Sequence, residues 1–428
     1  MPSSDTSPLV SPKAVSQAHW LWRDYITLLQ GPGGLWLIYA LAALYSFAFF
    51  LTSTVIGLYL TEEFGASDFE AGLVYCALGL MCALAAIVEG VVPDKYSLRF
   101  CLVIAGILLA LSFLPMALAP SRWLFEISVL TLFPAGIGLT LTVTKVAVKR
   151  FTQPTERSTA YSLLFAAVSG AGAFASLAVD LVSGFSESAW TYRSLLFLGM
   201  GTALFSSLLA YFIQEEPPQM EGNYWANWGK VVSLDQCRVL FLIVLTLVFV
   251  KAGYRQLDAT LPRYMRRELG HSAHFGIVML VHPIILLLAA LLCTPLVLCV
   301  QSYWLIVAGA TISAVSSFIL FATGCHYWSI LLYVTIMTIG EAIWNPRLYD
   351  YAIHKAPAGL EGLFMAITTL PRFLSMVPAG LMAGLLLPTL CPAAGTHCDV
   401  VWVVVGALAL VSPVALVVIK MRLKGNFV

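Results

Sequence analysis

The sequence predicts an all-α membrane protein with twelve transmembrane helices. The segment from Leu35 to Leu60 contains no Asp, Glu, Lys, Arg or His, and about 20 apolar residues let a helix cross the roughly 30 Å core of a bilayer. Similar segments recur along the 428 residues, of which 60% are hydrophobic and 11% charged. They are apolar on all sides, without the alternation of transmembrane β-strands, so they indicate helices.

The elements follow in order along the chain. The expected spans cover residues 35–60, 69–92, 100–119, 123–147, 158–184, 191–213, 237–262, 274–299, 303–323, 327–352, 360–388 and 400–420. The expected domains are a cytosolic tail (1–34), a six-helix bundle (35–213), a cytosolic linker (214–236), a second six-helix bundle (237–420) and a cytosolic C-terminal tail (421–428). The first 30 residues carry no apolar signal core, which favours a tail over a cleaved signal.

The Lys and Arg residues of the loops predict the orientation. Lys95, Lys149, Arg150 and Lys230 fall on the side that holds the N-terminus, whereas acids dominate the first loop on the other side. Because basic loops stay in the cytosol, both termini are expected inside. The host membrane is left open between the plasma membrane and an internal membrane.

Polar residues 214–236 divide the spans into six and six. The two halves also share a short similarity, because Ala147–Arg150 aligns with Ala352–Lys355, and Glu156 with Glu361 at the same offset. This similarity is weak by itself. Two repeated halves of six helices are typical of a large class of transporters, whose binding site lies between the halves near the bilayer midplane.

The loop after the second span resembles a motif of the major facilitator superfamily. Gly90 is followed by Asp94, Lys95 and Arg99 at the family's spacing, with Ser97 where the family prefers Gly. The resemblance implies the major facilitator fold. It also implies that Asp94, with Lys95 and Arg99, belongs to a gate that closes the inner side. The alternative is a solvated turn with ordinary inner-side charges.

The tenth span resembles the proton-coupled oligopeptide transporter branch of that superfamily. Its matching residues are Gly340, Glu341, Asp350, Tyr351, Ala352, Ala356 and Pro357. The chain departs from the branch in its first span, which has no Glu-x-x-Glu-Arg cluster, and in its fourth, where the lysine of the branch falls on Thr140. The resemblance implies a proton-coupled carrier whose solute is peptide-like or of another class.

Ionisable residues inside the spans gather in the second half. Lys251, Arg255 and Asp258 are spaced by four and three residues, which places them on one helix face. Glu341 and Arg372 lie near the middle of the tenth and eleventh spans. A charge inside a bilayer costs at least about 2.5–3.5 kcal/mol and faces a cavity or a partner.

These charges predict a central binding site. Lys251, Arg255 and Arg372 are expected to bind a carboxylate or phosphate group, because mid-membrane cations can grip such groups. Glu341 and, secondarily, Asp258 are expected to carry the proton, since burial and neighbouring cations shift the pKa of a carboxyl in opposite directions. The alternative is that the charges only neutralise one another and hold helices together.

Three further sets of residues have expected roles. Tyr39 and Tyr45 are expected to add polar surface to the substrate site from the first span. Arg347 and Asp350 are expected to form a structural ion pair near the inner end of the tenth. Cys391 and Cys398 lie in an outer loop, where an oxidising exterior would permit a disulfide, with Cys325 as an alternative partner on the same side.

The sequence contains no P-loop, no Gly-x-Ser-x-Gly elbow and no Cys/His set with metal-ligand spacing. We therefore expect no enzyme, no metal and no cofactor, and the net charge of +1 gives no reason to expect a nucleic-acid partner. The predicted function is alternating-access transport of a small anionic or zwitterionic solute, with protons and the lipid bilayer as the other partners and a monomer as the expected state. A multidrug or metabolite exporter and a non-transporting membrane sensor are the alternatives.

Overall fold

The computed structural model describes residues 28, 31–89, 92–153, 156–185, 189–214, 235–270, 273–297, 301–355, 364, 367–392 and 398–422. Every regular element in these ranges is a helix. Eleven helices are long and apolar enough to cross a membrane, and Phe275–Ala289 is a shorter apolar helix in the place of the eighth predicted span. The predicted all-α membrane fold is confirmed.

The first half of the chain forms what we call the N-bundle. Its helices are α2 (Gly33–Glu63), α3 (Asp68–Glu89), α4 (Val92–Lys95), α5 (Leu98–Leu118), α6 (Arg122–Leu130), α7 (Leu132–Phe151), α8 (Arg157–Phe185) and α9 (Ala189–Ala210). The fourth predicted span is divided into α6 and α7 at Thr131, whose dihedrals are φ −118° and ψ −79°. The helix α2 begins inside the glycine-rich stretch that the sequence analysis placed in the tail, because Pro32 supplies an extended N-cap.

The second half forms the C-bundle. Its helices are α11 (Asp235–Ala259), α12 (Leu261–Leu269), α13 (Phe275–Val297), α14 (Ser302–Thr323), α15 (Tyr327–Lys355), α17 (Leu370–Leu374), α18 (Met376–Leu390) and α19 (Val400–Arg422). The eleventh predicted span, 360–388, is interrupted at Ser375, and part of it lies outside the described residues. Most of the linker 214–236 also lies outside them, as do most of the two tails.

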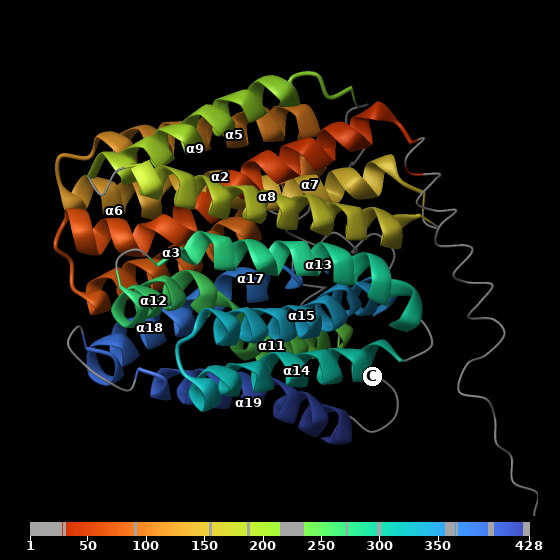
Figure 1. Ribbon diagram of the computed structural model, residues 1–428. Helices are drawn as coiled ribbons and strands as arrows, with labels where there is room; N and C mark the ends of the chain where they lie inside the picture. The colour runs from red at the N-terminus through yellow and green to blue at the C-terminus, as the bar shows by residue number, and fades with distance from the viewer. Residues whose placement is uncertain are drawn as a thin grey trace, which may run out of the picture.

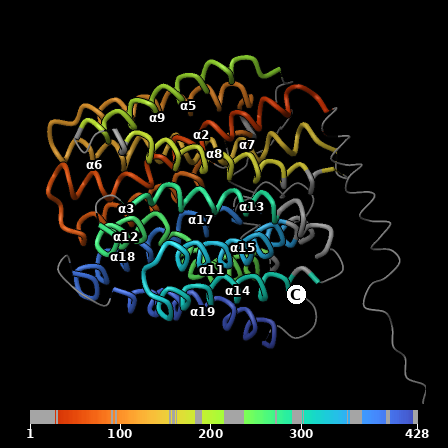
Figure 2. Tube along the Cα trace, viewed as in Figure 1, coloured from red at the N-terminus to blue at the C-terminus, as the bar shows by residue number. Residues whose placement is uncertain are grey.

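The two bundles lie side by side with their helices roughly aligned (Figures 1 and 2). Across the interface α3 packs against α18, and α8 packs against α13. The first pair is in backbone contact, because a Cβ atom added at Gly72 would lie 2.4 Å from the carbonyl oxygen of Gly380. Glycine at these positions allows that close approach.

Ion pairs join the bundles at the predicted outer end. The carboxylate of Asp68, at the start of α3, contacts Arg263 Nη1 at 2.9 Å and Arg267 Nη2 at 2.6 Å. Glu62, at the end of α2, pairs with Arg266. In each pair the acid belongs to the N-bundle and the cation to α12, so opposite charges hold this end of the interface closed.

Candidate functional site

A cavity lies between the bundles and is lined from both. Helices α2, α7 and α8 supply its N-bundle wall, and α11, α13, α15 and the segment around α17 supply its C-bundle wall. Aromatic residues from both bundles form part of this lining, including Phe50, Tyr161, Phe165, Tyr254, Trp344 and Tyr349. Five of the residues predicted for substrate binding or proton coupling line this one cavity: Lys251, Arg255, Asp258, Glu341 and Arg372.

Glu341 is the centre of a buried three-residue cluster in the cavity wall. Its side chain on α15 is 4% exposed. One carboxylate oxygen pairs with Lys251 of α11, and the other lies 2.9 Å from Nε2 of His282 on α13. Asn345, one turn further along α15, donates to the same carboxylate at 3.4 Å. Three helices therefore converge on one acid, and His282 is a member that the sequence alone did not assign to the site.

Arg255 and Asp258 form a second ion pair one turn along α11. Arg255 Nη1 lies 2.9 Å from Asp258 Oδ2, as their spacing of three residues allows. Arg255 also donates from Nε and Nη2 to the backbone carbonyl of Arg372, at 3.3 and 3.2 Å. Its guanidinium lies 5.4 Å from the ring centre of Phe49, so a cation of the C-bundle packs on α2 of the N-bundle.

Arg372 differs from the other predicted cations, because it has no carboxylate partner among the described residues. Its Nε and Nη2 atoms are buried and without a hydrogen-bond partner there. The guanidinium lies 5.3 Å from the ring centre of Phe49 and 5.4 Å from that of Phe50. These aromatic faces hold the cation without neutralising it.

Lys145 is a cavity residue that sequence reasoning did not include in the site. It lies on α7 and donates from Nζ to Thr369 Oγ1 of the C-bundle at 2.6 Å. The ammonium is 5.3 Å from the ring centre of Tyr349. The available signal was its depth: Lys145 lies one turn before Lys149 and Arg150, and therefore deeper in the membrane than these inner-side charges.

Tyr39 and Tyr45 lie away from the cavity, although they were expected to contribute to it. Tyr39 donates its hydroxyl to the carbonyl of Ala160 at 3.0 Å, and Tyr45 donates to Leu102 at 2.7 Å. Both side chains are buried between helices of the N-bundle. Their hydroxyl groups satisfy buried backbone acceptors, which explains their positions on the inward face of α2.

The predicted inner gate is described only in part. The side chains of Asp94 and Lys95 lie outside the described residues. Arg99 donates from Nε to the carbonyl of Ile213 at 2.8 Å, a contact inside the N-bundle. Ser97, which stands where the family prefers glycine, has φ −64° and accepts a hydrogen bond from Phe100 N. The turn needs no glycine here, because Ser97 is an N-cap with ordinary dihedrals.

The predicted pair of Arg347 and Asp350 also stays a prediction. Arg347 is buried on α15, and the side chain of Asp350 lies outside the described residues.

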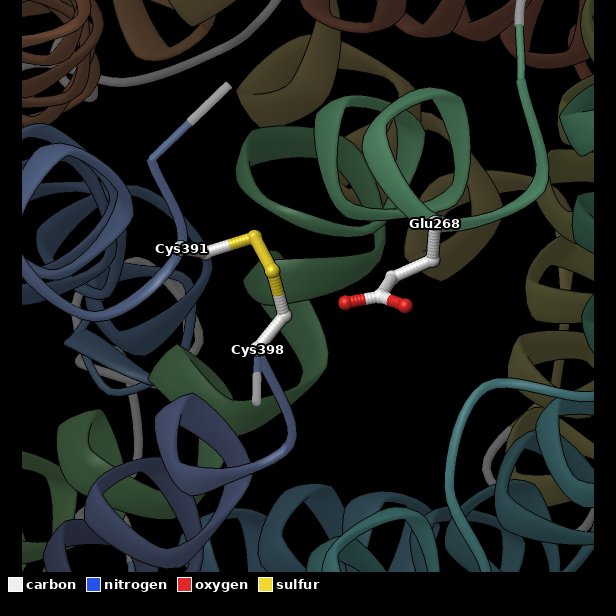
Figure 3. A group of neighbouring side chains, drawn as sticks. All are labelled: Glu268, Cys391 and Cys398. Carbon is white, nitrogen blue, oxygen red and sulfur yellow. A yellow bond between two sulfur atoms is a disulfide. The ribbon is translucent and has the colours of Figure 1, made fainter. Parts of the chain in front are cut away.

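Cys391 and Cys398 are joined by a disulfide at the predicted outer end, with a Cα–Cα distance of 4.4 Å. Figure 3 shows the carboxylate of Glu268 on the neighbouring α12 close to this bond. Because the two sulfur atoms are bonded to each other, they are not thiolate ligands for a metal. Cys325, the alternative partner, is a free thiol, and burial raises its pKa to about 12.

Comparison with known structures gives the same fold. A POT family transporter in complex with a thioalcohol-conjugated peptide matches with a TM-score of 0.76 at 12% identity, over 92% of this chain and 97% of that one. A D-xylose-proton symporter matches with a TM-score of 0.75 at 17% identity, over 92% and 99%. A nucleoside transporter matches with a TM-score of 0.70 at 15% identity, over 90% and 99%.

A search of curated proteins finds no match. The family model of the Major Facilitator Superfamily matches residues 38–380. This match spans both bundles and most of the chain. It identifies the protein as a transporter rather than an enzyme. The chain belongs to the major facilitator superfamily.

Proposed function

We propose that this protein is a proton-coupled secondary transporter of a small organic solute with at least one negative charge, working by alternating access. The observation that carries the proposal is the Lys251–Glu341–His282 cluster in the cavity between the bundles. A cluster of this kind can link the binding of a proton to the binding of an anion.

The physical link is competition for Lys251. While Glu341 is ionised, its carboxylate holds the Lys251 ammonium in an ion pair. When Glu341 takes a proton, that attraction is lost and the ammonium can bind an anionic solute instead. His282 can receive or return the proton through its own contact with the carboxylate. Proton and anion are then bound together, which is the requirement for symport.

The charge of the cavity supports an anionic solute over a cationic one. Among its described lining residues, Lys145, Lys251, Arg255 and Arg372 are cations and only Asp258 and Glu341 are carboxylates. Both carboxylates are in ion pairs. Two positive charges are left over, and a low-dielectric wall strengthens their attraction for an anion. A multidrug carrier would need acids for its cationic solutes.

The matched structures include carriers of suitable solutes. POT transporters of this fold have been solved in complex with a conjugated peptide, 5-aminolevulinic acid or sulfate, and another protein of this fold is a D-xylose-proton symporter. Zwitterions and anions therefore belong first in a panel of test solutes.

Uptake into proteoliposomes tests the proposal. Labelled short peptides, amino acids, carboxylates, phosphate esters and xylose would be offered with and without an inward proton gradient. We expect the gradient to accelerate uptake of an anionic or zwitterionic member, and Glu341→Gln to remove that acceleration. Glu126→Gln, which changes a carboxylate paired with Arg122 outside the cavity, is the matched control. Unchanged gradient-driven uptake by Glu341→Gln would falsify the coupling mechanism.

A further inference from the structure

Lys145 and Arg372 belong to opposite bundles and approach each other at the cavity. Lys145 on α7 donates to the side chain of Thr369, and the backbone N–H of Arg372 in turn donates to the carbonyl of Thr369 at 3.1 Å. Both side chains line the cavity between the bundles. Two basic residues, one from each bundle, therefore meet at Thr369.

Neither cation is neutralised by the described residues. Lys145 has a hydroxyl and an aromatic ring as neighbours, and Arg372 has two aromatic rings. The buried Nε and Nη2 atoms of Arg372 have no hydrogen-bond partner in the described part of the chain. Leaving donors of a charged group unsatisfied is costly, and so is holding like charges together in a low dielectric. An anion placed between the two cations removes both costs.

The geometry points to an oxyanion seat, formed by Lys145, Thr369 and Arg372, that binds the carboxylate or phosphate group of the transported solute. This inference rests on the proposed function and adds to it the residues and the chemical class. The guanidinium offers a fork of donors that matches an oxyanion, the ammonium offers a point charge, and Thr369 offers a hydroxyl. The rings of Phe165 and Trp344 line the same cavity, which suits a solute with a flat apolar body.

The seat also gives the anion a mechanical role. In the empty carrier, repulsion between Lys145 and Arg372 opposes closer approach of the bundles at the cavity. A bound oxyanion attracts both cations and reverses the sign of that interaction. The loaded carrier can then close around the solute, whereas the empty carrier is hindered from doing so. Part of the binding energy of the anionic solute thereby favours the closed conformation of the carrier.

Thermal unfolding of the purified full-length protein tests the seat without a known substrate. The probes are benzoate, phenyl phosphate and neutral benzamide, at constant ionic strength set with potassium chloride. We expect benzoate or phenyl phosphate to raise the unfolding temperature in a concentration-dependent way, and benzamide to have no such effect. The larger shift identifies the preferred group as a carboxylate or a phosphate. An equal response to benzamide, or no response to either anion, would overturn the seat.

Variants locate the response. Lys145→Gln and Arg372→Gln should weaken the apparent affinity for the anion about tenfold or more, which corresponds to about 1.4 kcal/mol. Lys145→Arg keeps the charge and should retain most of the affinity. The control is Lys420→Gln, because Lys420 stacks on Tyr303 and Trp304 away from the cavity. An unchanged affinity in Lys145→Gln would overturn the assignment.

The uptake assay separates this inference from the proposed function. An anion response that depends on Lys145, in a protein without gradient-driven uptake, would support the seat and contradict proton-coupled transport. Gradient-driven anion uptake that is unaffected in Lys145→Gln would contradict the seat and support the transport function.

Discussion

Asp180, near the end of α8, accepts hydrogen bonds from the backbone N–H groups of Gly276 at 2.9 Å and Ile277 at 2.7 Å, in the first turn of α13. A carboxylate of the N-bundle thus caps a helix of the C-bundle. The contact is close, because a Cβ atom added at Gly276 would lie 2.5 Å from Asp180 Oδ1. In this contact, as in the ion pairs of Asp68 and Glu62, the acid belongs to the N-bundle and the donor to the C-bundle.

Removal of this cap should favour opening at that end. In Asp180→Ala the first N–H groups of α13 lose an anionic acceptor, which costs about 1 kcal/mol in a closed state. We expect the closed population to fall about fivefold relative to the open one. Spin labels at Ser121 and His326, one in each bundle, would report the change as a longer distance. Asp180→Asn should lie between alanine and wild type, and identical distance distributions in all three proteins would contradict this role of Asp180.

The pair of Lys251 and Glu341 should be strongly coupled in stability. Removing either charge leaves its partner buried and uncompensated, which costs about 3–5 kcal/mol. We expect Lys251→Met and Glu341→Met each to lower the unfolding temperature, and the double variant to recover much of the loss. A double-mutant cycle of thermal unfolding measures the coupling. Purely additive losses would mean that the two side chains do not interact.

The disulfide between Cys391 and Cys398 provides a test of orientation. In cells shown by surface labelling to carry the protein in the plasma membrane, we expect a membrane-impermeant reductant to reach the bond from outside, because the loop is predicted to face the exterior. Loss of a cross-link over so short a loop should cost about 2–3 kcal/mol. Mass spectrometry of alkylated peptides would measure reduction, and Cys391→Ser/Cys398→Ser should match the reduced protein in stability. In those cells, reduction only after permeabilisation would reverse the predicted topology.

Cys325 should react slowly with maleimide at neutral pH. Burial raises the pKa of this thiol to about 12, so it stays protonated, and the nucleophilic thiolate is scarce below that value. The labelling rate should therefore rise about tenfold per pH unit between pH 7 and 9, without a plateau. Rates measured on the purified protein with Cys325→Ser as the blank would check this. A plateau near pH 8.5 would show an ordinary exposed thiol.

The order of the membrane-spanning helices could be predicted from the sequence, because every segment inside a bilayer has to satisfy its backbone hydrogen bonds internally. The uncharged run from Leu35 to Leu60 must satisfy its backbone internally, so it forms a helix whatever its neighbours are. The common helix face of Arg255 and Asp258 was equally local, since the two residues are three apart, whereas their ion pair is a finding of the structure. The interruption near Ser375 was missed, although Pro378 marks it in the sequence, because a proline has no backbone N–H to donate to the carbonyl of Leu374.

Contacts between helices could not be predicted in this way. They depend on how each helix is rotated about its axis and on the depth of its residues in the membrane, and no local sequence pattern gives either quantity. Tyr39 and Tyr45 are polar aromatic residues, a type that was expected to line the cavity. On α2, however, both hydroxyl groups donate to backbone carbonyls inside the N-bundle. From the sequence, Lys145 is expected among the inner-side charges. The structure instead places it against Thr369, next to α17. Glu341 meets Lys251 and His282 from two other helices far away along the chain.

By itself, the sequence determined that this chain crosses a membrane many times, in two halves, with ionisable groups concentrated in the second. The tertiary structure alone decided which of those groups neutralise each other and which have no acidic partner among the described residues. The reason is physical: span formation is a transfer of one segment from water to lipid, whereas the charge state of the passage is a sum over side chains that only packing brings within a few ångströms.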